Sequence, residues 1–143
     1  MSLLYKLFLD TKWAGQEVEA STGALNLNAA AGGTSGLGGA DVFTIPAAGR
    51  IEILSAIIDM VNCTNTATIT VRAFTDIDGA EAMIYQQSFT RTAPPVVGSD
   101  PDGIQVISGN YGTNEPIRFE MYSNNAGDNA VIVPYKATWR VMQ

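Results

Sequence analysis

The sequence predicts an all-β protein, an antiparallel β-sandwich of the jelly-roll kind with about eight strands. Three observations predict it: apolar and polar residues alternate along several segments, turn-forming residues separate these segments, and β-branched residues are frequent within them. The chain has 143 residues, of which 46% are hydrophobic and 15% are charged. This composition suits one globular domain and excludes a disordered chain or a coiled coil.

Residues 1–40 are predicted to form an N-terminal arm or extended segment, distinct from a sandwich domain over residues 41–143. Two short apolar pieces, residues 4–9 and 25–27, are separated by polar and small side chains. Residues 29–40 are so rich in glycine that a stable helix is disfavoured, because glycine loses the most conformational freedom on folding. This tract is predicted to be a flexible loop or arm.

The first strands of the sandwich are predicted from β-branched residues and from the prolines and glycines that end them. A strand is expected over residues 41–45, just before Pro46. Residues 50–61 carry apolar side chains on both faces, which favours a central strand buried on both sides over a helix. Residues 66–75 alternate between apolar and polar side chains, as in a strand with one buried face.

A β-hairpin is predicted next. Asp78 and Gly79 form a strong turn signal, because glycine accepts the positive φ that a tight hairpin turn needs. The return strand is expected over residues 82–91, and Pro94 and Pro95 end it because proline has no amide to give to a neighbouring strand.

The last part of the chain is predicted to hold three more strands. A short strand is expected over residues 103–107, followed by a polar loop over residues 108–114. Two longer strands are expected over residues 116–123 and 130–142. In the first, Ile117, Phe119 and Met121 are expected to point inward and Arg118 and Glu120 outward. In the second, Lys136 is expected on the outward face. This second strand alternates most regularly, and Trp139 shares its apolar face, which predicts that this side chain belongs to the core.

The charge and the missing residue types exclude several functions. Fourteen acidic residues against eight basic ones give a net charge of −6, and no run of basic residues could follow a nucleic-acid backbone. The chain has no histidine, which excludes Ser-His-Asp and Cys-His nucleophiles and histidine-ligated zinc. The single cysteine, Cys63, cannot form an internal disulfide. We therefore expect no enzymatic activity, no cofactor and no nucleic-acid partner.

No motif for a phosphate or a metal ion is complete. Residues 33–39 look like a glycine-rich phosphate loop, but Gly39 stands where the motif requires lysine. Asp76, Asp78 and Glu81 gather at the predicted hairpin turn, where a solvated turn is the favoured interpretation and calcium the open alternative. The glycine directly after Asp78 breaks the spacing of the EF-hand calcium loop, so no metal site is predicted.

The start of the chain does not predict export or a membrane. Residues 1–10 lack the long apolar region and the small-residue cleavage site of a signal peptide. No apolar run approaches the ~20 residues that a membrane span requires. Synthesis in the cytoplasm and no membrane partner are expected.

An acidic sandwich over residues 41–143 follows a Gly/Ala-rich segment and closes on residues 133–140, Val-Pro-Tyr-Lys-Ala-Thr-Trp-Arg. This layout resembles that of tailed-bacteriophage virion proteins, in particular small head-decoration or minor capsid proteins with jelly-roll folds. The resemblance implies a non-enzymatic structural protein of the virion, made in the host cytoplasm. It further implies a homotrimer that binds the outside of the capsid and clamps neighbouring subunits of the major capsid protein.

If the resemblance holds, the N-terminal arm is expected to reach a neighbouring subunit or the shell by strand pairing. The alternative function is a carbohydrate- or receptor-binding module of a phage tail or fibre, because an aromatic residue in a polar loop suits a sugar. A glycosidase would require two carboxyl groups facing one cleft. The residues expected to contact a partner under one function or the other are Leu4, Leu7, Leu9, Trp13, Asn110, Tyr111 and Asn114.

Overall fold

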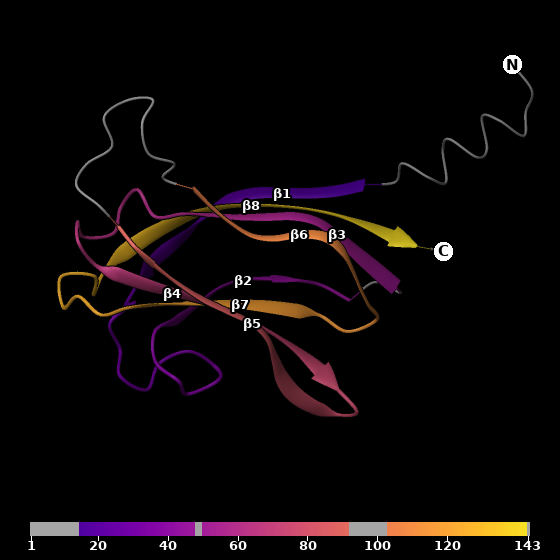
Figure 1. The fold of residues 1–143 in the computed structure, drawn as a ribbon, viewed down its shortest axis with the longest axis horizontal. Helices are drawn as coiled ribbons and strands as arrows, with labels where there is room; N and C mark the ends of the chain where they lie inside the picture. The colour runs from indigo at the N-terminus through magenta and orange to yellow at the C-terminus, as the bar shows by residue number, and fades with distance from the viewer. Residues whose placement is uncertain (1–14, 48–49, 92–102, 143) are drawn as a thin grey trace, which may run out of the picture.

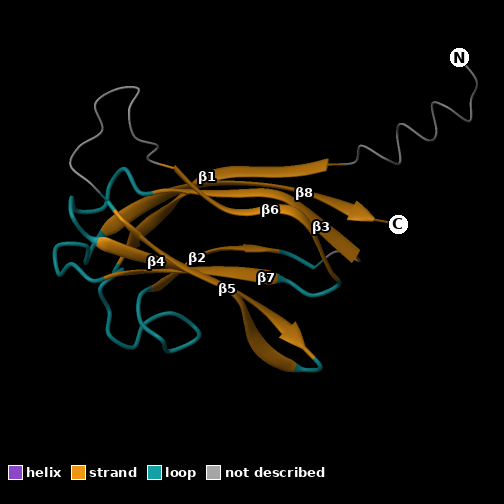
Figure 2. Cartoon of the chain, viewed as in Figure 1, coloured by secondary structure: helices purple, strands orange, loops and turns teal. Residues whose placement is uncertain are grey.

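The computed structural model describes residues 15–47, 50–91 and 103–142. Every regular element among them is a β-strand (Figure 2). The strands in chain order are β1 (Gly15–Leu25), β2 (Ala40–Ile45), β3 (Arg50–Asp59), β4 (Thr68–Ile77), β5 (Ala80–Thr90), β6 (Gly103–Thr113), β7 (Ile117–Ser123) and β8 (Val131–Met142).

The strands form two four-stranded sheets that face each other (Figure 1). The order in one sheet, here called sheet A, is β1-β8-β3-β6, and the order in the other, sheet B, is β2-β7-β4-β5. All neighbouring strands are antiparallel. The first strand pairs with the last, the second with the seventh, the third with the sixth and the fourth with the fifth. This nested pairing is a long hairpin rolled into two layers, which confirms the predicted antiparallel jelly-roll sandwich.

The core lies between the two sheets. Ile117, Phe119 and Met121 of β7 are fully buried, as their alternation predicts, and Trp139 of β8 is buried too. The ring of Phe43 stacks on Phe119 of its own sheet and on Tyr135 of sheet A, with centroids 4.4 Å apart in each case. These aromatic contacts hold the two layers together, because buried aromatic side chains contribute large contact areas.

The hairpin predicted at Asp78 and Gly79 is present. These residues form the turn between β4 and β5, with Ile77 opposite Ala80, and both have a positive φ, 55° and 76°. Two positive φ values in succession match the twist of a tight hairpin, which confirms the physical reason for the prediction.

The predicted division at residue 40 is wrong. β1 lies within the supposed arm, yet it pairs with β8 from Gly15 opposite Arg140 to Leu25 opposite Val131. Leu27, just after β1, is fully buried in the core. Residues 15–40 therefore belong to the sandwich, because the backbone of an edge strand pairs with its neighbour even where its side chains carry little apolar pattern.

β6 is longer than predicted. A polar loop was expected over residues 108–114, but the strand continues to Thr113 and sets Tyr111 opposite Ile53 of β3. Glycine and asparagine in this segment favour turns locally, but the hydrogen-bonded ladder with β3 outweighs that preference.

Candidate functional site

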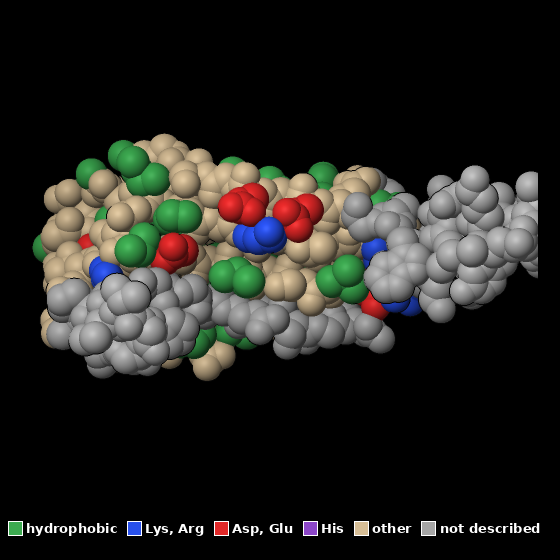
Figure 3. All heavy atoms as spheres, turned by 90° about the horizontal axis from the view of Figure 1, so that it is seen from above, with side chains coloured by type: hydrophobic (Ala, Val, Ile, Leu, Met, Phe, Trp, Pro, Cys, Tyr) green, Lys and Arg blue, Asp and Glu red, His purple; other side chains and the backbone are tan. Residues whose placement is uncertain are grey.

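The outer faces of the two sheets differ in what covers their charged side chains. Among the charged residues of sheet A are Arg140 and the buried Glu52, which form an ion pair. On sheet B, the glycine-rich loop between β1 and β2 lies over the outward-pointing residues of β7. On sheet A, the outward-pointing residues of β1, β3 and β8 face solvent (Figure 3). Both surfaces are candidate sites.

Beneath the glycine-rich loop lies a group of charged residues, here called the Arg118 cluster: Asp41, Glu81, Arg118 and Glu120. The Arg118 guanidinium donates to all three carboxylates, and its Nη1 lies 2.6 Å from Asp41 Oδ1. The same guanidinium lies over the ring of Phe74, 4.7 Å from its centroid. One cation therefore joins β2, β5 and β7 on the outside of sheet B.

The carboxylate of Glu120 fastens the loop to the sheet. It is fully buried although it points away from the core, because the loop covers it. Ser35 donates to it twice, from the backbone nitrogen at 2.8 Å and from Oγ at 2.5 Å. Thr34 donates to the neighbouring Asp41 from its nitrogen at 3.2 Å and from Oγ1 at 2.5 Å. The predicted flexible tract is thus a loop held by carboxylates.

The pKa values in the Arg118 cluster follow from these contacts. Burial alone would raise the pKa of Asp41, but hydrogen bonds from Thr34 and Arg118 lower it below the ordinary value. Burial alone would lower the pKa of Arg118, but its hydrogen bonds to Glu81, Glu120 and Asp41 raise it. Both groups are held in their charged forms.

Glycine is required where the loop meets the sheet. Gly33 has a φ of +73°, and a Cβ there would lie 2.9 Å from the Glu120 carboxyl carbon. Gly39 has a φ of +93°, and its Cβ would lie 2.1 Å from the carbonyl oxygen of Met121. Glycine alone combines this backbone conformation with such a close approach. The glycines suit the loop to packing on sheet B, not to a phosphate.

A second buried carboxylate joins the loops at one end of the sandwich. Asp128 is 1% exposed and accepts hydrogen bonds from the backbone nitrogen and Oγ1 of Thr64, at 2.7 and 2.6 Å, and from Ser123 Oγ at 2.5 Å. Its backbone oxygen accepts from Leu27 at 2.9 Å. All these donors are neutral, and they tie three connections together without an ion pair.

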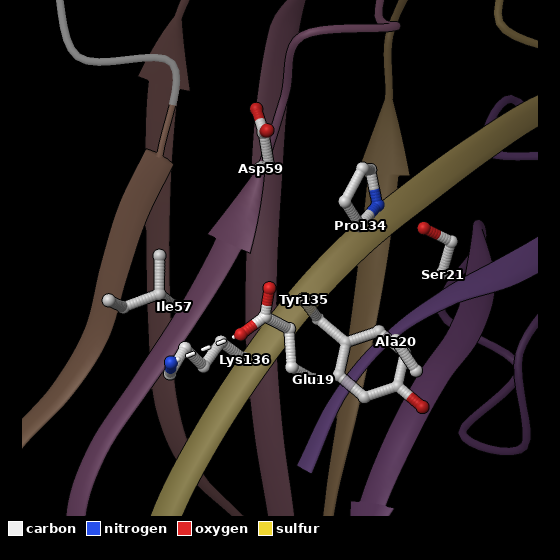
Figure 4. Close-up of a pocket in the computed structure, with 8 residues that line it drawn as sticks. All are labelled: Glu19, Ala20, Ser21, Ile57, Asp59, Pro134, Tyr135 and Lys136. Atoms are coloured by element: carbon white, nitrogen blue, oxygen red, sulfur yellow. Dashed lines mark hydrogen bonds and ion pairs between the residues drawn. The ribbon is translucent and has the colours of Figure 1, made fainter.

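An open groove of about 440 Å³ lies on sheet A (Figure 4). Lys136 Nζ lies there between two carboxylates of β1, 3.1 Å from Glu17 Oε1 and 3.1 Å from Glu19 Oε2. The hydrogen bonds to Glu19 and then to Glu17 raise the pKa of Lys136. The residues that line the groove are Glu19, Ala20, Ser21, Ile57, Asp59, Pro134, Tyr135 and Lys136.

The groove suits binding better than proton transfer. Two of its residues, Glu19 and Asp59, carry carboxyl groups, which a glycosidase would require in a pair. The Glu19 side chain is 71% exposed and bonded to Lys136, while Asp59 Oδ1 accepts a hydrogen bond from Val61 N at 2.8 Å. Neither is enclosed in the dry, apolar environment that makes a carboxyl group a general acid.

The residues expected to contact a partner are not brought together by the described structure. Leu4, Leu7, Leu9 and Trp13 lie outside the described residues. Asn110 and Tyr111 lie in β6 and not in a loop, and Asn114 is exposed just after that strand.

Sequence reasoning placed Lys136 on the outer side of β8 but missed its partners, because β1 was not predicted. It also missed the Arg118 cluster, whose members come from three strands. The one available signal was the outward position of Arg118 and Glu120 on β7.

The described residues contain neither a group of three histidine, cysteine, aspartate or glutamate side chains that could hold a metal ion, nor a helix that could cross a membrane. At the predicted hairpin, the Glu81 carboxylate is bonded to Arg118. No family model and no curated protein sequence matches this chain.

Proposed function

We propose that this protein is a non-enzymatic structural protein of a virion that binds and stabilises a capsid surface as an oligomer. The observation that carries the proposal is the nested strand order, β1-β8-β3-β6 against β2-β7-β4-β5. Jelly rolls of this kind build many viral capsid proteins, and also lectins. Because one fold serves many functions, the surface has to support the choice.

The outer face of sheet A supports a contact with another protein. It exposes three large aliphatic side chains, Leu54, Ile57 and Ile132, the last of them 48% exposed. Lys136 and its two carboxylate partners lie on the same face. Apolar side chains bordered by charged ones are typical of protein interfaces.

The net charge of −6 fits a partner with a positive surface, and the partner proposed is the major capsid protein. On this proposal the outer face of sheet A lies against the shell. The loop-covered face of sheet B then points away from it.

Binding to shells tests the proposal. Purified protein is sedimented with empty capsids of the virus that encodes it, and a saturable bound fraction is expected. Ile57→Asp puts a charge on the outer face of sheet A and should lower the apparent affinity at least about tenfold, the effect of ~1.4 kcal/mol.

Ile77→Asp is the matched control, because Ile77 is an isoleucine at the end of β4 in sheet B that is more exposed than Ile57, 58% against 36%. It should leave binding unchanged. The proposal would be wrong if the unaltered protein did not bind shells at saturating concentration, or if the two substitutions lowered the affinity equally.

The groove favours a second candidate, a carbohydrate-binding module. A volume of about 440 Å³ lined by Ser21, Pro134 and charged side chains is within the range of small-ligand sites. A screen of immobilised glycans followed by calorimetric titration would test it. Lys136→Ala should abolish binding of any sugar found, while Lys136→Ala protein that binds as well as the unaltered chain would exclude the groove as the site.

A further inference from the structure

The edges of the two sheets differ in how well they are protected against pairing with another chain. Among the strands that the structure describes, the edge strands are β1 and β6 in sheet A and β2 and β5 in sheet B. An edge strand presents unpaired backbone groups, and charges, prolines, bulges or short length keep such edges apart.

Three of the edges carry such protection. β1 presents Glu17 and Glu19, and its register with β8 shifts between Ser21 and Ala24. β2 has only six residues and is followed by Pro46. The register of β6 with β3 shifts twice along its length.

The second half of β5 lacks every one of these features. Tyr85–Thr90 has the sequence Tyr-Gln-Gln-Ser-Phe-Thr, with no charged residue, no proline and no glycine. It pairs with β4 residue by residue, from Thr68 opposite Thr90 to Ala73 opposite Tyr85, without a register shift. None of its side chains is fully buried. Short uncharged segments of this composition pair readily with copies of themselves.

The side chains of this segment are already held in place for pairing. Tyr85 and Phe89 pack against the core from the inner face of sheet B, and Gln87 between them accepts a 2.8 Å hydrogen bond from the Tyr85 hydroxyl. On the other face, Gln86 accepts from Arg72 Nε at 3.1 Å. Pairing would therefore cost little side-chain ordering.

We propose that Tyr85–Thr90 pairs antiparallel with the same segment of a second copy, about a two-fold axis at Gln87. This register sets Gln87 opposite itself and Tyr85 opposite Phe89 at two symmetric positions, and aromatic pairs across strands are favourable. The contact joins two sheets B into one continuous sheet. It is self-complementary, as a two-fold interface between identical chains has to be.

The charges at the two ends of β5 favour the antiparallel arrangement. Glu81 lies near the start of the strand and Arg91 follows its end. Antiparallel pairing keeps the two copies of each charge apart, whereas parallel pairing would bring the two Glu81 and the two Arg91 side chains together. The inference does not depend on a role in a virion.

The test is the molecular mass in solution, measured by sedimentation velocity over a range of concentrations. The unaltered chain should sediment as a dimer, with twice the 15.2 kDa of one chain. Gln87→Lys and Gln87→Glu each set two like charges at the axis and should yield monomers with an unchanged circular dichroism spectrum. Mixing the two variants should restore a dimer, because opposite charges then meet at the axis.

Gln16→Lys is the matched control, because Gln16 is an exposed glutamine on the edge strand β1. It should leave the dimer intact. A monomeric unaltered chain at its highest soluble concentration would overturn the inference. So would a trimer, or any oligomer that survives both Gln87 substitutions. Shell binding is measured separately, so loss of the dimer and loss of the proposed function remain distinguishable.

Discussion

The Lys136 ion pairs on sheet A and the Arg118 cluster on sheet B use the same chemistry in opposite surroundings. On sheet A, Lys136 and its partners are exposed, so water screens their attraction and the pairs stabilise little. On sheet B, the loop leaves Arg118 14% exposed and Glu120 fully buried, so each charge depends on the other. An exposed ion pair, as on sheet A, leaves its surface open to a partner. An ion pair covered by a loop, as on sheet B, holds that loop to the sheet instead.

The largest expected difference in stability is between the variants that remove the cation from each face. Arg118→Ala leaves the buried Glu120 carboxylate without a counter-charge, which should lower the free energy of unfolding by roughly 3–5 kcal/mol. Urea unfolding followed by circular dichroism measures it. Lys136→Ala is the matched variant on sheet A, and its unfolding midpoint should equal that of the unaltered chain. Equal losses would show that the loop does not protect the Arg118 cluster.

The fit of the loop can be separated from its backbone strain by two glycine substitutions. Gly39→Ala combines a φ of +93° with a Cβ placed 2.1 Å from a backbone oxygen. It should lower the free energy of unfolding by more than the backbone strain alone, about 1–3 kcal/mol, and the displaced loop should expose Glu120.

Gly36→Ala is the control, because Gly36 has a φ of +70° but open space around its Cβ position. Gly36→Ala should lower the free energy of unfolding by about 1 kcal/mol, the cost of the backbone conformation alone. The urea unfolding midpoints of the two variants measure this difference in stability. Similar midpoints would mean that the close contact between the loop and the sheet adds nothing to the cost of the Gly39 substitution.

A smaller effect is expected from pH. Because the folded pKa of Asp41 lies below its ordinary value, the carboxylate adds stability above that ordinary value, and this stability is lost as the pH falls through the folded pKa. Asp41 is partly exposed, so the free energy of unfolding of the unaltered chain should exceed that of Asp41→Asn by less than about 1 kcal/mol at pH 6.

The urea midpoints of both chains, measured between pH 6 and pH 3, should therefore begin to approach each other below about pH 4, the ordinary aspartate value, and should meet only below the folded pKa of Asp41. A gap that stays constant over this range would show that hydrogen bonding to Asp41 does not depend on its charge.

Strands with a regular apolar pattern could be predicted from the sequence. β7 and β8 have one buried and one outward face, so alternation alone found Phe119 and Trp139 in the core. The hairpin at Gly79 was found because one residue type satisfies a specific backbone conformation.

The remaining elements depend on contacts between distant parts of the chain. β1 was missed because, as an edge strand, it sends only Val18 and Leu25 against the core, too few to form a pattern. Glu120 was correctly placed outward, but its burial depends on a loop 85 residues away in the sequence. Alternation tells which face a side chain occupies, and it does not tell what covers that face.

The pairing of the first described strand with the last one has a mechanical consequence. Gly15 lies opposite Arg140, so both ends of the described chain leave the sandwich at the same end of one ladder (Figure 1). Force applied through these two ends would peel β1 from β8 one hydrogen bond at a time, and would not shear many bonds together. Tension between these two ends would therefore open the molecule at β1. Pulling on an interior strand would instead strain its hydrogen bonds to both neighbouring strands at the same time.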